Sequence, residues 1–198
     1  IKDGNGGFDK LAGTLEIEIA NLDGVTYGFV AGGSDRAVEI INLTDPADPT
    51  SAGTIENLGS FPYEVEVQTI NNSNYVFIAS ANKVEIVNID NLSNPSLITS
   101  LEDGVGGYEL LDGAFTLTYD FINNNHYLFI GSEYDSGVQI INVNDPSNPI
   151  ATAHISHGEI GFNKLKGVNS IKTVDVGSKT YAWVTASHST IIDGVQII

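Results

Sequence analysis

An internal repeat constrains the fold of this chain more than any other feature of its sequence. The segment 38–49, VEIINLTDPADP, returns in related form at 84–95 and at 138–149, and a fourth copy begins at Val195. An apolar stretch that opens with a tyrosine precedes each copy, with spacings of 48, 52 and 54 between Tyr27, Tyr75, Tyr127 and Tyr181. A period of about 50 residues is typical of architectures that build one supersecondary unit several times and stack the copies.

Each repeat carries short runs in which apolar and polar residues alternate, as in Leu15, Ile17 and Ile19. Alternation with period two, bounded by Gly and Asn, predicts half-buried strands, here at about 14–20, 27–31, 38–43 and 50–55 in the first repeat. The doubled Asp-Pro of 45–49 predicts a tight turn between the third and fourth of these strands. The sequence therefore predicts an all-β fold, a β-propeller built from four repeats of about 46–57 residues with four antiparallel strands per blade.

We expect residues 1–198 to form a single repeat domain with units at approximately 1–55, 56–101, 102–155 and 156–198. Because Ile198 falls inside the third strand of the fourth unit, the chain is also expected to be a segment of a longer protein. Apolar residues at matching positions are expected to be buried between sheets, namely Ile17, Phe29, Ile40, Val67, Phe77, Ile86, Leu117, Phe129, Ile140, Ile171, Trp183 and Ile197.

At these residues the sequence resembles the LVIVD-repeat family. The resemblance rests on Val-Glu-Ile-Ile-Asn and Val-Gln-Ile-Ile-Asn ahead of Asp-Pro, on the strand opened by tyrosine, and on a Gly-aromatic-x-x-Leu-x-Gly loop, as in 7–13. It implies a β-propeller of cell-surface or secreted proteins, and it carries over no catalytic residue. The second repeat departs from the pattern, with Asn91 and Leu92 in place of Asp-Pro and a shortened loop at 59–63.

The composition excludes several classes of function. Eight Lys and Arg against 25 Asp and Glu give a net charge of −17, which repels a nucleic-acid backbone. The absence of cysteine removes disulfides and thiolate chemistry, and no apolar run approaches the length of about 18 residues that a membrane helix needs. We therefore expect no nucleic-acid partner and no membrane insertion.

Acidic residues gather in the loops that are expected on one face of the propeller. Glycine-rich loops bearing carboxylates are typical of calcium sites, because glycine lets the backbone turn sharply among hard oxygen ligands. The candidate ligands are Asp3, Asn5 and Asp9 in the first repeat and Asp103, Glu109 and Asp112 in the third. The alternative is a solvated acidic face whose Asp, Asn and Gly only form turns.

No catalytic constellation stands out in the sequence. Nucleophile elbows, phosphate-binding loops and zinc-protease motifs are absent, and His157, His188 and Asp193 form only a weak candidate for a transition-metal site. His126 and His154 fall near strands and favour structural roles.

The sequence thus predicts a non-enzymatic extracellular or cell-surface scaffold for adhesion or assembly, with other subunits or further repeats as partners. The alternative is a calcium-dependent binding protein or a hydrolase that uses the acidic loop face.

Overall fold

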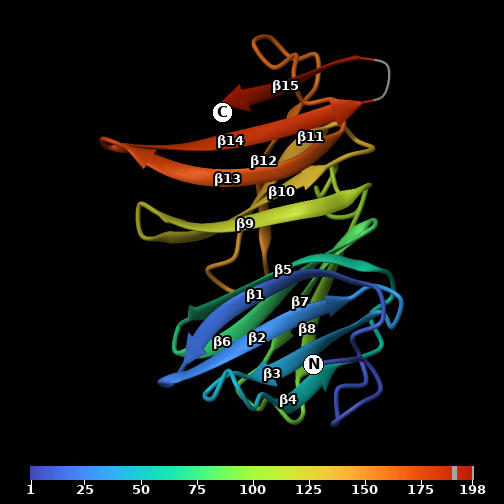
Figure 1. Ribbon diagram of the computed structural model, residues 1–198. Coiled ribbons are helices and arrows are strands. Elements are labelled where there is room, and N and C mark those ends of the chain that lie inside the picture. The colour runs from blue at the N-terminus through green and yellow to red at the C-terminus, as the bar shows by residue number, and fades with distance from the viewer. Residues whose placement is uncertain (189–190, 198) are drawn as a thin grey trace. The chain divides into compact units, whose positions relative to one another are not determined.

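The computed structural model describes the backbone of residues 1–188 and 191–197, and it contains strands and no helix in that part of the chain. Two sheets come from the first half of the chain, with strands in sequence order. They are β1 (Thr14–Leu22), β2 (Val25–Gly32), β3 (Ala37–Asn42) and β4 (Thr50–Ile55), and then β5 (Pro62–Ile70), β6 (Ser73–Ser80), β7 (Lys83–Asn88) and β8 (Ser96–Glu102) (Figure 1).

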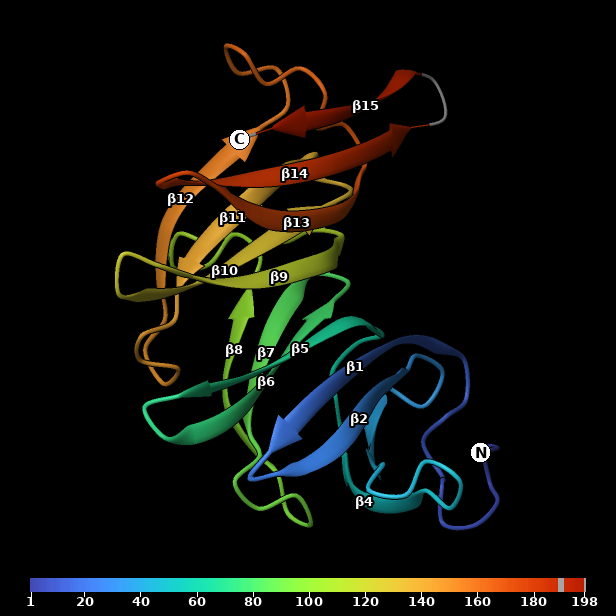
Figure 2. The same cartoon turned by 60° about the vertical axis from the view of Figure 1, so that its left-hand side comes forward.

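The second half of the chain repeats this plan. Its four-stranded sheet comprises β9 (Ala114–Ile122), β10 (Asn125–Ser132), β11 (Gly137–Asn142) and β12 (Ile150–Ser156), and its last sheet comprises β13 (Val168–Val176), β14 (Lys179–His188) and β15 (Ile191–Ile197). Figure 2 shows the strands of each sheet following one another as a meander. The predicted all-β propeller fold and its strand positions in the first repeat are confirmed.

The hairpin turns follow from the residues at their tips. Asp23 and Gly24 link β1 to β2 with φ values of 51° and 84°, and Asn71 with Asn72 does the same between β5 and β6 at 52° and 65°. Two consecutive residues with positive φ match the right-handed twist of the flanking strands, and Asp, Asn and Gly tolerate that conformation best.

The Asp-Pro turns are built as the sequence predicts. The Asp45 carboxylate accepts a hydrogen bond from the Ala47 amide at 2.9 Å, and the Asp48 amide donates to the Asp45 carbonyl at 3.0 Å. In the third repeat, hydrogen bonds from the Ser147 hydroxyl and amide lower the pKa of Asp145. The carboxylate thus replaces a backbone acceptor and closes the connection between the last two strands of the sheet.

The chain divides into two compact units, one comprising 1–80 and 85–98 and the other comprising 81–84 and 99–198. In the first unit the core lies between the first two sheets, where Phe29 and Ile40 of one sheet meet Val65 and Ile78 of the other. In the second unit the core joins the last two sheets, and its members include Phe129, Val138, Ile171, Ala182 and Val184. The prediction of a single domain over 1–198 stays a prediction.

Three of the residues expected in the core are exposed instead. Ile17 is 52% exposed, Trp183 is 46% exposed and Ile197 is 44% exposed, whereas Phe29, Ile40, Phe77, Ile86, Leu117 and Ile171 are fully buried. Val67 and Phe129 are also buried, and Ile140 is half-buried. The prediction was wrong at these three positions because it treated every repeat as having a packed sheet on both sides. Ile17 lies on the first sheet and Trp183 and Ile197 lie on the last, on faces that no neighbouring sheet covers within their unit.

Candidate functional site

The acidic loop of the third repeat brings together three carboxyl groups. The side chains of Asp103 and Asp135 are hydrogen-bonded to each other, and Asp112 lies close enough to interact electrostatically with Asp135. Backbone amides hold both ends of this pair, since Leu111 donates to Asp103 Oδ1 at 2.9 Å and Asp112 donates to Asp135 Oδ2 at 2.7 Å. Burial, together with the neighbouring carboxyl groups of Asp103 and Asp112, raises the pKa of Asp135.

The first repeat contains the same arrangement, which indicates what the pair does. Leu11 donates its amide to Asp3 Oδ1 at 3.1 Å, and Ala12 donates to Asp35 Oδ2 at 2.9 Å. Because the pattern recurs with Ala12 in place of Asp112, its common purpose is to hold the loop. A direct hydrogen bond also places two carboxyl groups closer than the separation of about 5 to 5.5 Å, or more, that glycosidases use to flank a bond.

A buried polar side chain from the third strand of the sheet supports each of these loops. Glu39 Oε2 accepts from the Lys10 amide at 3.1 Å, and Glu39 Oε1 accepts from the Ser51 hydroxyl at 2.6 Å. Gln139 Oε1 accepts from the Glu109 amide at 3.1 Å in the third repeat. Both side chains are fully buried. We call the segments 2–12 and 102–112 the anchored loops.

The residues predicted as calcium ligands serve these loops in different ways. The carboxylates of Asp3 and Asp103 accept hydrogen bonds from these loops, and Glu109 and Asp112 donate their backbone amides. The exposed Asp9 has no part in the hydrogen bonds described above. The backbone of Asn5 bridges to Phe8. In the part of the chain that is described, no group of three or more Asp, Glu or His side chains is arranged to hold a metal ion. The assignment of these residues to calcium stays a prediction.

His126 lies among aromatic side chains. The ring of His126 lies 2.6 Å from the Tyr119 hydroxyl and packs against Phe121, and burial lowers the pKa of His126, as suits a structural residue. The side chains of His188 and Asp193 lie outside the described residues, so the predicted metal site with His157 stays a prediction.

A second group of carboxyl groups, which the sequence reasoning missed, lies on the first strands of the two sheets in the first unit. Glu16 and Glu18 of β1 and Glu64 and Glu66 of β5 are all half-buried. β1 lies beside β5, and Glu16 Oε2 accepts a hydrogen bond from the Val65 amide at 3.3 Å. The Glu16 carboxylate therefore reaches the backbone of β5, whose Glu64 and Glu66 alternate with the buried Val65 and Val67 and so lie on the opposite side of that strand.

The signal for this group was present in the sequence as a repeated Glu-x-Glu. Glu16 and Glu64 occupy the same repeat position, 48 residues apart. The corresponding positions hold Thr116 in the third repeat and Ser170 in the fourth. Two glutamates at i and i+2 on one strand have Cα atoms about 6.6 Å apart and point to the same side.

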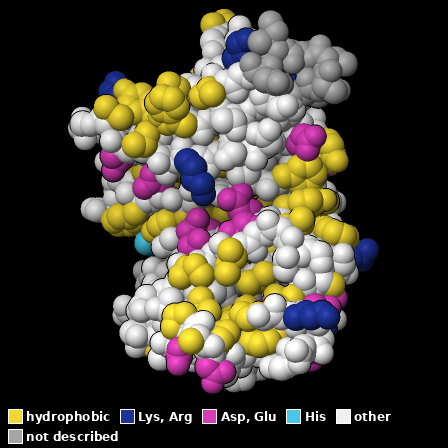
Figure 3. All heavy atoms as spheres, viewed as in Figure 1, with side chains coloured by type: hydrophobic (Ala, Val, Ile, Leu, Met, Phe, Trp, Pro, Cys, Tyr) yellow, Lys and Arg dark blue, Asp and Glu magenta, His cyan; other side chains and the backbone are white. Residues whose placement is uncertain are grey.

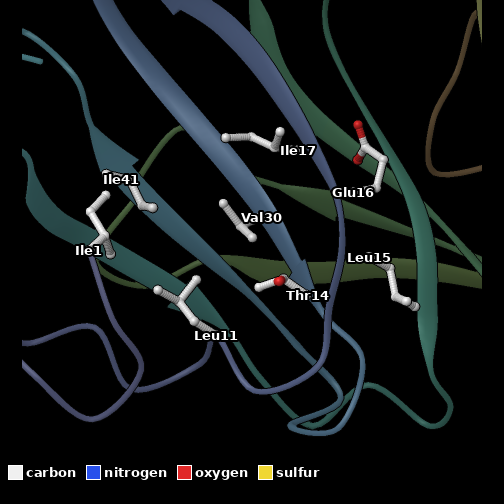
Figure 4. Close-up of a pocket in the computed structure, with 8 residues that line it drawn as sticks. All are labelled: Ile1, Leu11, Thr14, Leu15, Glu16, Ile17, Val30 and Ile41. Carbon is white, nitrogen blue, oxygen red and sulfur yellow. The ribbon is translucent and has the colours of Figure 1, made fainter.

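An apolar groove of about 350 Å³ lies on the other face of the first sheet. Figure 4 shows Ile17, Val30 and Ile41 pointing into it beside Ile1 and Leu11, with Glu16 on the far side of its strand. The groove contains few polar atoms, so it fits an apolar surface better than a polar small molecule.

No family model matches the chain, and no curated protein matches its sequence. The search of solved structures gives clear matches in the fold. An α-L-arabinofuranosidase from Clostridium thermocellum superposes with a TM-score of 0.63 at 12% identity, covering 96% of this chain and 69% of the enzyme. An α-L-arabinofuranosidase from Lactobacillus brevis gives a TM-score of 0.58 at 15% identity, covering 100% and 74%.

The exo-β-1,3-galactanase from Phanerochaete chrysosporium gives a TM-score of 0.61 at 11% identity, covering 99% of this chain. The chain spans 47% of the length of the galactanase.

These likenesses correct the prediction of a non-enzymatic scaffold. Two α-L-arabinofuranosidases and an exo-β-1,3-galactanase are among the solved structures that share this arrangement of sheets. The prediction was wrong because it took a strong repeat without a catalytic motif as evidence against catalysis, although a propeller can carry its carboxyl groups on strands, where no short motif marks them.

For membrane association, the described residues contain no helix that is long and apolar enough to cross a bilayer.

Proposed function

We propose that this chain hydrolyses glycosidic bonds and that the glutamates of β1 and β5 supply its acid and base groups. The observation that carries the proposal is the position of Glu16 and Glu18, which are half-buried on β1, the strand of the first sheet that lies beside β5 and its own pair of half-buried glutamates. The likeness in fold to arabinofuranosidases and a galactanase supports the same class of reaction.

Hydrolysis of a glycosidic bond requires two carboxyl groups and a water molecule. One carboxyl group protonates the oxygen of the departing sugar, and a second carboxylate either activates a water molecule or attacks the anomeric carbon. Half-buried glutamates suit both roles, because partial exclusion of water strengthens their interaction with charge that develops on the sugar ring. An extracellular setting, where polysaccharides are met, is part of the proposal.

The test measures hydrolysis of 4-nitrophenyl α-L-arabinofuranoside and β-D-galactoside and of β-1,3-galactan by the 198-residue protein. We expect Glu16→Gln and Glu64→Gln to lower kcat at least about 100-fold, as the loss of a general acid or base does. Asp48→Asn, in an exposed turn, is the matched control and should retain full activity. Failure of the unaltered protein to cleave any of these substrates, or full activity in both glutamine variants, would contradict the proposal.

A further inference from the structure

The turn at the tip of the first anchored loop contains an exposed asparagine, Asn5. In this turn the Gly4 amide donates to the Phe8 carbonyl at 2.7 Å, and the Phe8 amide donates to the Asn5 carbonyl at 3.4 Å. The Asn5 amide donates to the Lys2 carbonyl at 3.2 Å. The hydrogen bonds that close the turn are thus made by the backbone, and they do not engage the Asn5 side chain.

The third and fourth repeats show that this turn forms without an asparagine. Val105 and Glu159 stand at the position of Asn5, and each makes the same antiparallel bridge to the aromatic residue three positions later. These two turns lie in the interior of the sequence and are also open to solvent, since Val105 is 59% exposed and Ile160 is 101% exposed. The exposure of the turn is therefore a property of the repeat and does not depend on where the chain begins.

The residue after Asn5 makes this asparagine chemically distinct. Asn5 is the only asparagine in the sequence that is followed by a glycine, Gly6. Gly6 has a φ of 68°, and the turn is closed by the amides of Gly4, Asn5 and Phe8, which leaves the Gly6 amide outside its hydrogen bonds. A glycine has no Cβ that would shield its amide nitrogen from the side chain before it. The Gly6 nitrogen is thus open to attack on the side-chain amide of Asn5.

We propose that Asn5 is a site of spontaneous deamidation in the folded protein. The Gly6 nitrogen attacks Cγ of Asn5 and a C–N bond forms. The amide nitrogen of Asn5 then leaves as ammonia, with the proton that the Gly6 nitrogen gives up. One water molecule opens the resulting cyclic imide at either of its carbonyl groups, which gives aspartate or isoaspartate. Water is the only co-reactant, and the inference is independent of the proposed hydrolase activity.

Both products carry a new carboxylate close in sequence to Asp3 and Asp9, in a chain whose net charge is already −17. Figure 3 shows Asp and Glu side chains spread more widely than Lys and Arg over the face in view, so the added charge is repelled.

Isoaspartate also inserts one carbon atom into the main chain of the loop. The insertion lies between Asp3, whose carboxylate accepts the Leu11 amide, and Lys10, whose amide donates to Glu39. These two contacts hold the first anchored loop, so the longer main chain should loosen it.

The experiment keeps the folded protein at about 37 °C and a pH of about 8 for several weeks, since asparagine is a heat-labile residue. Mass spectrometry of peptides then measures the loss of the amide at each asparagine, and an isoaspartate methyltransferase labels the isoaspartate product. We expect Asn5 to react at least about tenfold faster than Asn72, an exposed asparagine that is followed by Ser73 and its shielding Cβ. The rate at Asn5 should rise with pH, because the attacking nitrogen must lose its proton.

Asn5→Val, which copies the third repeat, is the matched variant. It should keep the circular dichroism of the unaltered protein and release ammonia only at the slow rate of the other asparagines. In converted protein, hydrogen exchange should become faster at the amides of Gly4 and Leu11 and stay unchanged at their counterparts Gly104 and Leu111.

Two results would overturn the proposal. One is a loss of amide at Asn5 that is no faster than the loss at Asn72. The other is release of ammonia from Asn5→Val that is as fast as release from the unaltered protein. Equal hydrogen exchange in the two anchored loops of converted protein would overturn the inferred effect on the first loop.

Discussion

The pair Asp103 and Asp135 differs from the equivalent pair Asp3 and Asp35 in its acidic surroundings, although both pairs hold a loop. Both anchored loops use an aspartate pair to accept amides, but only the third repeat adds a third carboxyl group, at Asp112. The pKa of Asp135 is raised by burial first and by its acidic neighbours second. A carboxyl group with a raised pKa stabilises the folded state below its ordinary value of 3.8, and this contribution is lost as pH rises through the folded pKa.

We therefore predict that Asp135→Asn is at least as stable as the unaltered protein at pH 7, with a gain within about 2 °C in Tm, as expected of one half-buried side chain in a loop. Asparagine keeps an oxygen that can accept the Asp112 amide and removes the charge. The advantage should shrink as pH falls towards the ordinary pKa of 3.8, because the raised pKa lets folded Asp135 bind its proton first. Thermal melts of the two proteins between pH 4 and 7 check this. Asp35→Asn, which faces Ala12, is the control and should show no gain. A loss of stability that grows with pH would contradict the prediction.

Among the strands, β3 and β11 have an additional role, because each sends a buried polar side chain to hold an anchored loop. Glu39 accepts the Lys10 amide and the Ser51 hydroxyl. Gln139 instead accepts the Glu109 amide and donates its Nε2 to the Ala153 carbonyl at 2.8 Å. Ala151, where the first repeat has Ser51, needs no acceptor, so the two repeats satisfy their buried groups by different pairs of residues.

This predicts that Glu39→Gln combined with Ser51→Ala, which copies the third repeat, changes the free energy of unfolding by less than about 1 kcal/mol. Replacing Glu39 by Leu should lower that free energy by about 2 kcal/mol or more, because the Lys10 amide and the Ser51 hydroxyl lose their buried acceptor. Urea titrations followed by circular dichroism measure both. Equal losses in the two variants would show that packing, and not the hydrogen bonds, holds the loop.

The strands themselves could be read from the sequence, whereas the burial of their residues could not be read completely. Alternation and turn residues located β1 to β4 to within two residues, because both signals are local. Burial was predicted wrongly for Ile17 and Trp183 because it depends on what packs against a sheet face. Equivalent positions in different repeats have different neighbours, and these two residues lie on faces without a neighbouring sheet in their unit. Glu16 and Glu64 were overlooked for a related reason, since an isolated Glu-x-Glu looks like the solvated side of a strand until β5 is found beside β1.

At the scale of the whole molecule, the net charge of −17 is the dominant electrostatic property. Ionic strength therefore acts on stability through self-repulsion, since raising salt from about 0.01 M to about 0.1 M shortens the screening length from about 30 Å to about 10 Å. The ion pair between Lys10 and Glu56, at 3.4 Å, responds to salt in the opposite sense, but an exposed pair of this kind contributes little.

We predict that Tm rises by several degrees over this range of sodium chloride, and differential scanning calorimetry checks it. Calcium chloride at matched ionic strength tests the calcium hypothesis for Asp3, Asn5, Asp9 and their counterparts, because a bound ion stabilises the folded state beyond screening. Equal shifts in the two salts would contradict that hypothesis, and no shift in either salt would contradict the argument from self-repulsion.

The anchored loops have a consequence for how such a chain can diversify. The side chains that fix the backbone of each loop lie in the same repeat as the loop. Duplication of a repeat therefore copies these side chains together with the loop that they hold. Side chains at the water-facing positions can then vary freely, as Asp9 against Glu109 and Ala12 against Asp112 already do. New recognition surfaces can arise on these loops by single substitutions, without any change in the way the chain folds.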